Sequence, residues 1–405
     1  MSLTRHRWFI LALAAFVNLF AGSIYAWSVF AAPLAEHLSQ VAGTTLAAGD
    51  MAVAFSLANA VGPLPLLIGG WITDRFGPRS VMMAGGILSG LGYWMTGSAQ
   101  SFTAVLVGYG LLFGIGLGLV YGCTVSNTLK FFPDHRGFAG GLTTAAYGLS
   151  SAVIAPLAAH FIGTLGVADT LRSLGVAIGC VAVIGGLFSV RCPADFIPEG
   201  WTPTKSRFSQ GLDADWHQML KTPVFWSMWA LLLCGAITGM MILSHAQSIG
   251  MNVMGLSAAT AATGVAFLAF SNTSGRLLAG VLSDYLGRTR TLALALTSSI
   301  AGLTALASAS ADTVPLFYAG LAAVGLSLGA FMGVYPGFTT QEFGSRHNSV
   351  NFALMFMGFS LAGTVGPILM NQLQTAGFSI ACGAAAVIAA AGFLFIGLYR
   401  KQKLN

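Results

Sequence analysis

Arg276 has the most unusual chemical setting in this sequence, because it lies inside a long apolar segment. That segment reads GVAFLAFSNTSGRLLAGVL, from Gly264 to Leu282. A cation inside a lipid bilayer costs about 2.5–3.5 kcal/mol on insertion scales, so a buried guanidinium usually has an anion to meet. No carboxylate lies within one or two helical turns of Arg276. A planar guanidinium matches a carboxylate in two-point geometry, so we expect a carboxylate ligand supplied from outside the chain.

Asn272 extends the polar character of the same helical face. It lies four residues before Arg276, one turn away. A second interpretation is that Arg276 snorkels to an interface. The predicted helix ends only seven residues later, which is about 10 Å at 1.5 Å per residue. Because Asn272 carries polarity deeper into the segment, the pattern favours ligand binding over snorkelling.

The remaining charged residues lie near loops or helix ends. Of the 18 Lys and Arg, Arg276 is the one placed within an apolar segment, and none of the 12 acids is central. One positive charge neutralises one carboxylate, and a dianion would keep an uncompensated charge in a low dielectric. The sequence therefore favours a monocarboxylate ligand.

A proton could be carried by an imidazole. His245, in MMILSHAQSIG, is the candidate for a titrating side chain within an apolar segment. The alternatives are that His245 is a hydrated helix-end histidine, or that the ligand carboxylate itself carries the proton while Arg276 binds the anion.

The composition indicates an all-α polytopic membrane protein. The 405 residues are 56% hydrophobic and 7% charged, with a mean hydropathy of +0.79, whereas a soluble domain carries about 25% charged residues. A membrane-spanning helix needs about 20 apolar residues. We predict twelve spans in the lipid bilayer, at 8–32, 50–72, 79–98, 103–129, 137–163, 169–190, 223–249, 257–283, 289–309, 314–340, 349–373 and 377–399.

The N-terminal apolar run resembles a signal peptide, but it continues to about Ala32 without a small-residue cleavage site, so we interpret it as the first span. The five cysteines show neither metal-ligand spacing nor a disulfide framework, and no metal is expected. Glycine-rich strings such as GIGLGL follow no strand, so they favour helix packing over a nucleotide loop. No catalytic motif is found, so the sequence does not predict an enzyme.

The distribution of basic residues predicts the topology. With twelve spans both termini lie on one side, and sixteen basic residues fall on that side. The positive-inside rule makes that side cytoplasmic. The net charge of +6 therefore reports topology and does not indicate a nucleic-acid partner. These sixteen are Arg5, Arg7, Arg75, Arg79, Lys130, Arg136, Arg191, Lys205, Arg207, Lys221, Arg288, Arg290, Arg346, Arg400, Lys401 and Lys403.

The two halves of the chain repeat. GGWITDRFGPR, from Gly69 to Arg79, corresponds to AGVLSDYLGRTR, from Ala279 to Arg290. This is the pattern of parallel repeats in transporters, whose substrate site lies between the halves. We expect an N-terminal six-helix bundle at 1–190, a cytoplasmic linker with a short interfacial helix at 191–222, and a C-terminal six-helix bundle at 223–405.

The repeated loops predict a gate at the cytoplasmic side. An Asp at a helix end can pair with a nearby Arg or with the N-terminus of a neighbouring helix. We expect Asp74 to meet either Arg136 or such a helix N-terminus. The predicted gating residues are Asp74, Arg75, Arg79, Arg136, Asp284 and Arg288.

These loops resemble the signature loops of the major facilitator superfamily. The block LGLVYGCTVSNTLKFFPDHRGFAGGLTTAAYGLSS (Leu117–Ser151) and the linker stretch Met219–Pro223 resemble the oxalate:formate antiporter branch and the related monocarboxylate transporters, most of all bacterial lactate-type ones. The resemblance implies two six-helix bundles that rock about a central site. It also implies that Arg276 binds the substrate carboxylate, and it favours the inner membrane of a prokaryote.

The chain departs from these relatives at three positions. Asn272 stands where animal-type monocarboxylate transporters carry Asp, and Val29 stands near the position of their first-span Lys. Phe359 stands near the position of the second cation of oxalate:formate antiporters. The predicted substrate set is Arg276, Asn272, Tyr121, Tyr335, Phe359, Tyr25 and Tyr147, in which the phenols offer a hydroxyl donor and an apolar face.

The function expected from sequence is proton-coupled symport of a short monocarboxylate such as L-lactate, without a cofactor other than the coupled proton and without an obligate protein partner. Exchange of the oxalate:formate type is the alternative. A carboxylate sensor that does not transport would need a soluble output domain, and the longest loop is only about 30 residues. The sequence leaves lactate, pyruvate, acetate, propionate and formate open as substrates.

Overall fold

The described part of the chain is built from helices. The computed structural model describes residues 3–43, 45–47, 49–193, 196–202 and 213–404. Within these ranges every regular element is a helix, which confirms the expected all-α class. Lys205 and Arg207, two of the basic residues used to predict topology, lie outside the described residues.

The chain packs as two compact units. The N-terminal unit comprises Met1–Asp134, Ala146–Asp213 and Gly344–Ala353, and the C-terminal unit comprises His135–Ala145, Ala214–Phe343 and Leu354–Asn405. Each unit has its own apolar core. The boundaries expected from sequence follow chain order, whereas each observed unit also takes in one short segment from the other half of the chain.

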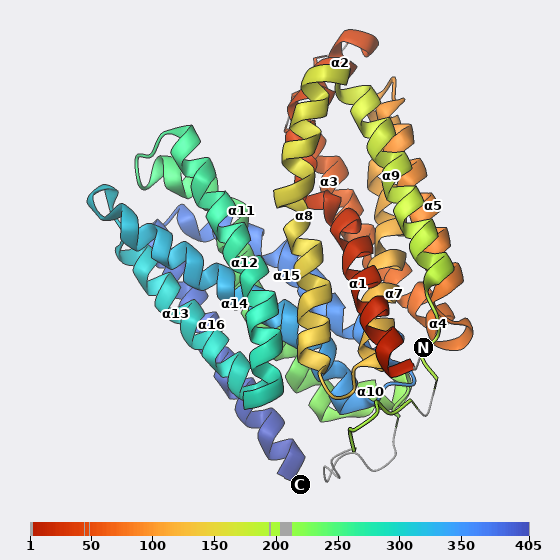
Figure 1. The fold of residues 1–405 in the computed structure, drawn as a ribbon. Helices are drawn as coiled ribbons and strands as arrows, with labels where there is room; N and C mark the ends of the chain where they lie inside the picture. The colour runs from red at the N-terminus through yellow and green to blue at the C-terminus, as the bar shows by residue number, and fades with distance from the viewer. Residues whose placement is uncertain (1–2, 44, 48, 194–195, 203–212, 405) are drawn as a thin grey trace. The chain divides into compact units, whose positions relative to one another are not determined.

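The N-terminal unit contains ten elements of its own and most of α8 (Arg136–Leu165) (Figure 1). These are α1 (Leu3–Ala21), η1 (Gly22–Ala26), α2 (Trp27–Ala42), α3 (Met51–Val61), α4 (Pro63–Phe76), α5 (Pro78–Gly97), α6 (Phe102–Val105), η2 (Leu106–Phe113), α7 (Gly114–Phe131) and α9 (Val167–Phe188).

The C-terminal unit contains seven elements of its own and most of α15 (Asn348–Gln374). These are α10 (Trp216–Lys221), α11 (Pro223–Asn252), α12 (Ala258–Leu286), α13 (Arg288–Ser308), η3 (Ala311–Thr313), α14 (Val314–Phe343) and α16 (Phe378–Leu404).

The helices fall where the apolar segments predict them. In the described residues, eleven helical stretches are long and apolar enough to cross a membrane. The other predicted span, 79–98, is the 20-residue helix α5. Its glycines allow close packing, because a Cβ at Gly90 would lie 2.8 Å from the carbonyl oxygen of Gly175 on α9. Small residues of this kind let transmembrane helices approach one another.

The repeated loops are one-residue links between helices. Gly77 joins α4 to α5 with φ +94°, and Gly287 joins α12 to α13 with φ +85°. Residues other than glycine are strained at such positive φ values. The glycine of each repeat therefore permits a sharp turn immediately after the helix that carries the motif aspartate.

Two spans of the N-terminal unit contain irregular helix. The first span passes from α1 through the 3₁₀ turn η1 into α2, and another passes from α6 through the π-helix η2 into α7. A Cβ added at Gly22 would overlap the carbonyl oxygen of Tyr147, so η1 lies in direct backbone contact with α8. π-helical segments often occur at functional sites.

The predicted short helix of the linker is present as α10. Asp215 and Gln218 form a capping box at its start, in which each side chain accepts a hydrogen bond from the other's backbone N–H. Such a box satisfies two of the donors that a helix start leaves open. Trp216, on its first turn, is exposed.

Candidate functional site

Arg276 lies deeper in its helix than the sequence indicated. α12 continues to Leu286, so ten residues follow Arg276, about 15 Å of helix at 1.5 Å per residue. Arg276 is buried, with only 2% of its surface exposed. The expected helix end at residue 283 was too early, and the longer helix weakens the snorkelling interpretation.

In the described part of the chain, Arg276 has two hydrogen-bond partners, and both are uncharged. Its Nε donates to Asn272 Oδ1 at 3.0 Å, and its Nη1 donates to the backbone carbonyl oxygen of Thr144 on α8 at 2.9 Å. Among the described residues, no carboxylate forms an ion pair with Arg276. A guanidinium has five N–H donors, so these two contacts orient the group and leave donors for a bound anion.

The turn that carries Asn272 and Arg276 is enclosed by close backbone contacts. A Cβ at Gly329 of α14 would overlap the Asn272 carbonyl oxygen, and one at Gly333 would overlap that of Arg276. On α8, a Cβ at Gly141 would lie 2.7 Å from the same Arg276 oxygen. The first turns of α8, which belong to the C-terminal unit, therefore meet α12 and α14 here, which explains how the backbone of Thr144 comes within reach of the guanidinium.

Three of the predicted aromatic residues cluster in the N-terminal unit. The ring of Tyr147, on α8, lies 4.8 Å from that of Tyr121 on α7 and 5.3 Å from that of Tyr25 on η1, measured between centroids. Tyr121 is buried, while Tyr25 and Tyr147 are partly exposed. Sequence spacing alone did not predict that these three rings touch.

The two predicted aromatic residues of the C-terminal unit have other surroundings. Tyr335 is buried in the core and donates its hydroxyl hydrogen to the Met228 carbonyl oxygen at 2.7 Å. Phe359 packs its ring 5.2 Å from that of Phe356. Because the Tyr335 hydroxyl already donates its hydrogen to this carbonyl, it has none to donate to a substrate. Tyr335 is therefore not part of the binding set proposed below.

His245 takes part in a small polar network near the end of α11. Its Nε2 lies 2.7 Å from Asn371 Oδ1 on α15, and its Nδ1 lies 2.7 Å from Ser244 Oγ. Asn371 Oδ1 has no hydrogen to give, so Nε2 is the donor of that pair. An imidazolium could donate at both nitrogens without moving, since the Ser244 hydroxyl lies within 2.8 Å of the Met240 carbonyl oxygen.

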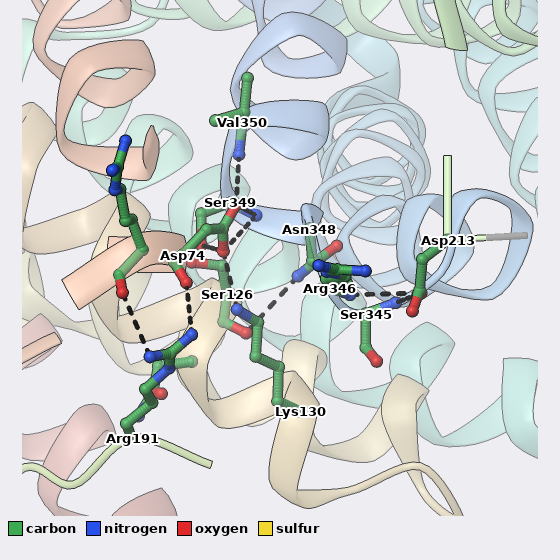
Figure 2. A network of polar contacts seen from close by, with 12 residues as sticks. Asp74, Ser126, Lys130, Arg191, Asp213, Ser345, Arg346, Asn348, Ser349 and Val350 are labelled. Carbon is green, nitrogen blue, oxygen red and sulfur yellow. Dashed lines mark hydrogen bonds and ion pairs between the residues drawn. The ribbon is translucent and has the colours of Figure 1, made fainter. Parts of the chain in front are cut away.

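Asp74 contacts the start of α15 (Figure 2). Its carboxylate accepts from the Ser349 hydroxyl at 2.7 Å, from the Ser349 backbone N–H at 3.2 Å and from that of Val350 at 3.4 Å. Lys130 Nζ lies 2.7 Å from the same carboxylate. A helix N-terminus was one of the two partners that the sequence predicted for Asp74. Lys130 and Ser349 were not foreseen.

Asp284 makes the corresponding contact in the C-terminal unit. It accepts from the backbone N–H groups of Gly137 and Phe138 at the start of α8, both at 2.8 Å. Arg288 Nη2 lies 2.9 Å from the same carboxylate. A helix start has unpaired N–H donors and a partial positive charge, so a carboxylate is stabilising there. Each repeated Asp therefore caps a helix that begins elsewhere in the sequence.

The other predicted gating residues make contacts of their own. Arg75 packs over the rings of Trp71 and Phe76, and Arg79 donates to the Leu187 carbonyl oxygen at 2.6 Å. Arg136 is the first residue of α8. Arg191, which the sequence did not single out, donates to the Asp74 and Arg75 carbonyl oxygens at the end of α4 (Figure 2).

Comparison with known proteins identifies the family. The sequence pattern of the Major Facilitator Superfamily matches residues 11–367. The chain belongs to the major facilitator superfamily. Its predicted fold is thereby confirmed, and this major facilitator is a multi-pass membrane transporter.

The relatives of this major facilitator include carriers of organic anions. It is 28% identical over 377 residues to the oxalate:formate antiporter of Oxalobacter formigenes, which covers 91% of this chain and 85% of that protein. It is 29% identical over 412 residues to monocarboxylate transporter 11 of Mus musculus, covering 97% and 87%. The predicted oxalate and monocarboxylate branch is consistent with both.

Solved structures support the fold alone. The fucose:proton symporter FucP of E. coli matches with a TM-score of 0.71 at 14% identity, covering 96% of this chain and 98% of that one. At this identity, the likeness carries no information about the substrate.

Proposed function

We propose that this major facilitator is a proton-coupled symporter of short monocarboxylates, of the L-lactate type, and that Arg276 binds the substrate carboxylate. The observation that carries the proposal is the setting of Arg276, which is buried and, among the residues that the structure describes, hydrogen-bonded to uncharged acceptors alone. A buried, unpaired cation is costly. A carboxylate substrate supplies the missing charge whenever it binds.

The charge balance supports a monocarboxylate. Arg276 is the basic residue that lies well inside a predicted span, since Arg79, Arg172 and Arg290 lie at span ends. Its neighbour Asn272 is neutral. One bound carboxylate gives a neutral site, whereas a dicarboxylate leaves one negative charge buried without a partner. The hydroxyls of Tyr121, Tyr147 and Tyr25 are proposed to contact the rest of the substrate, and Phe359 is proposed to add apolar wall.

Exchange of carboxylates is the second candidate. The 28% identity to an oxalate:formate antiporter favours it. The absence of a second cation at Phe359 favours symport of a monoanion over exchange of oxalate.

The proton has two proposed carriers. His245 can hold one, because its two nitrogens face Asn371 and Ser244 in an arrangement that suits the imidazolium. The substrate carboxylate is the other carrier. Asp74 and Asp284 are proposed to hold the cytoplasmic gate shut through the helix starts that they cap, with Arg75, Arg79, Arg136 and Arg288 around them. Rocking of the two units would then alternate access to the site.

The basic residues support an orientation with both termini in the cytoplasm of a prokaryote, with the chain in the inner membrane. This follows from the charge on the loops alone.

The decisive experiment is uptake of labelled L-lactate into proteoliposomes, with and without an inward proton gradient. We expect the gradient to drive accumulation in the wild type. Uptake that ignores the gradient but rises with internal carboxylate would replace symport by exchange.

The matched variant is Arg276→Lys, which keeps the charge and loses the planar fork. We expect its KM for lactate to rise by about tenfold or more, the equivalent of roughly 1.4 kcal/mol. An unchanged KM would show that two-point binding of the carboxylate is wrong.

A further inference from the structure

Four buried hydroxyls that share one region of the N-terminal unit form no well-aligned hydrogen bond. Tyr93 on α5, Tyr109 on η2, Ser23 on η1 and Ser150 on α8 are all 0% exposed. None of their hydroxyl oxygens meets the geometry of a hydrogen bond in the structure. Buried polar groups are almost always satisfied by protein or by ordered water, so such a region is a candidate position for internal water.

These hydroxyls lie close to one another. The rings of Tyr93 and Tyr109 have centroids 5.5 Å apart, edge to face. The hydroxyls of Ser23 and Tyr109 both lie close enough to the Tyr93 hydroxyl for a weak hydrogen-bonding interaction. Their distances or angles fall outside those of a well-formed hydrogen bond. Ser150 borders the same region, because a Cβ built on Gly22, next to Ser23, would lie 2.7 Å from the Ser150 Cβ.

The surroundings of the cluster are apolar and aromatic. The Trp27 ring stacks on that of Tyr109 at 3.7 Å, and Phe113 lies 4.8 Å from both tyrosine rings. Trp27 directs its indole N–H away, to the Met51 carbonyl oxygen. The hydroxyls are therefore enclosed by aromatic and apolar side chains. The irregular helices η1 and η2 supply two of the four, at points where regular α-helix is interrupted.

We propose that Ser23, Tyr93, Tyr109 and Ser150 bind internal water, and that this hydrated cluster relays the coupled proton. A buried water typically makes about three hydrogen bonds to polar groups that lack other partners. Hydroxyls that lie close together without a well-formed hydrogen bond match that requirement. In a row of hydroxyls and water molecules, each oxygen receives a proton from one neighbour and passes its own proton to the next. No group in the row therefore changes its net charge.

The relay rests on the proposed symport, whereas the water site does not. Tyr147 connects the cluster to the proposed substrate-binding tyrosines, because its backbone carbonyl packs against Gly22, next to Ser23, and its ring contacts those of Tyr121 and Tyr25. A hydroxyl and water route would carry a proton through a bundle whose acids lie at loops and helix ends.

The water site can be tested by X-ray hydroxyl-radical footprinting of the purified protein, which oxidises buried side chains beside bound water. Tyr335 is the matched control, since it is as buried as Tyr93 but its hydroxyl is bonded to the Met228 carbonyl. We expect Tyr93 and Tyr109 to be oxidised several-fold faster than Tyr335. Equal rates at all three tyrosines would overturn the proposal.

The relay can be tested with the Tyr93→Phe, Tyr109→Phe double variant in proteoliposomes. We expect a several-fold loss of proton-driven lactate accumulation with counterflow retained. Full proton-driven accumulation in this variant would overturn the relay. A wild type that transports no lactate at all would instead overturn the proposed function, and the footprinting result would still decide the water site. Tyr335→Phe serves as the control for loss of a buried hydroxyl.

Discussion

At the scale of single residues, Arg276 and Asn272 were predicted as a pair because residues four apart share a helical face. In the structure Arg276 Nε donates to Asn272 Oδ1 at 3.0 Å, a bond that goes beyond the shared face predicted from sequence. The Thr144 carbonyl could not be predicted, since a backbone oxygen is common to every residue and leaves no mark in the sequence. The same holds for the Met228 carbonyl that receives the Tyr335 proton.

Asn272→Asp places a carboxylate beside the guanidinium. We expect an internal ion pair that competes with the substrate and raises the KM for lactate by about tenfold or more, equivalent to roughly 1.4 kcal/mol. The control is Asn272→Leu, which removes the acceptor without adding charge and should have the smaller effect. A lower KM in the Asp variant than in the Leu variant would contradict the proposed role of Arg276.

Cys192 offers a test of burial outside the spans. Burial raises the pKa of its thiol to about 12, whereas the pKa of an ordinary cysteine is about 8.5. Because the raised pKa disfavours the thiolate, a variant with Cys192 as the sole cysteine should react slowly with maleimide between about pH 7 and pH 9, where an ordinary thiol ionises. Full labelling should require denaturation in SDS. Native labelling as fast as in SDS would contradict this burial.

At the scale of elements, the apolar segments predicted the helices well because hydropathy and span length are both set by the bilayer. Where helices end was harder to predict. α12 continues through Leu286 because a single glycine, Gly287, makes the turn to α13. The contacts of Asp74 with Lys130 and Ser349 join segments far apart in sequence, and no local pattern encodes them.

Gly333→Ala tests the close approach of α14 to α12. The new methyl group would overlap the Arg276 carbonyl oxygen, so the helices must separate. We expect a loss of stability of about 1–3 kcal/mol, measured as a lower midpoint of thermal unfolding in detergent, together with weaker lactate uptake. Gly363→Ala is the matched control, because a Cβ there meets nothing within 4 Å. Similar effects of the two substitutions would contradict the packing described.

At the scale of the whole molecule, the chain consists of two units with separate cores, and each unit includes a short segment from the other half of the sequence. The tandem repeat predicted two bundles of six helices. It did not predict that the first residues of α8 and of α15 would pack with the opposite bundle's helices, since that depends on the capping contacts of Asp284 and Asp74.

The orientation of the chain in the membrane is a property of the whole molecule. The basic residues on alternate loops predict that both termini are cytoplasmic. A green fluorescent protein fused after Asn405 should fluoresce in cells, and an alkaline phosphatase fused there should be inactive. Phosphatase inserted at Gly166, between α8 and α9, should be active. The reverse pattern would show that the orientation is wrong.

The capping contacts have a consequence for how these helix starts tolerate substitution. The donors at Gly137, Phe138 and Val350 are main-chain N–H groups. Every amino acid except proline retains that group, so substitutions at Phe138 and Val350 leave these donors in place, whereas a Cβ at Gly137 would overlap the Gly280 carbonyl oxygen. Variation that tunes the two contacts is therefore concentrated in the aspartates, their cationic neighbours and the Ser349 hydroxyl. Proline at Phe138 or Val350 would remove a main-chain donor from the helix side.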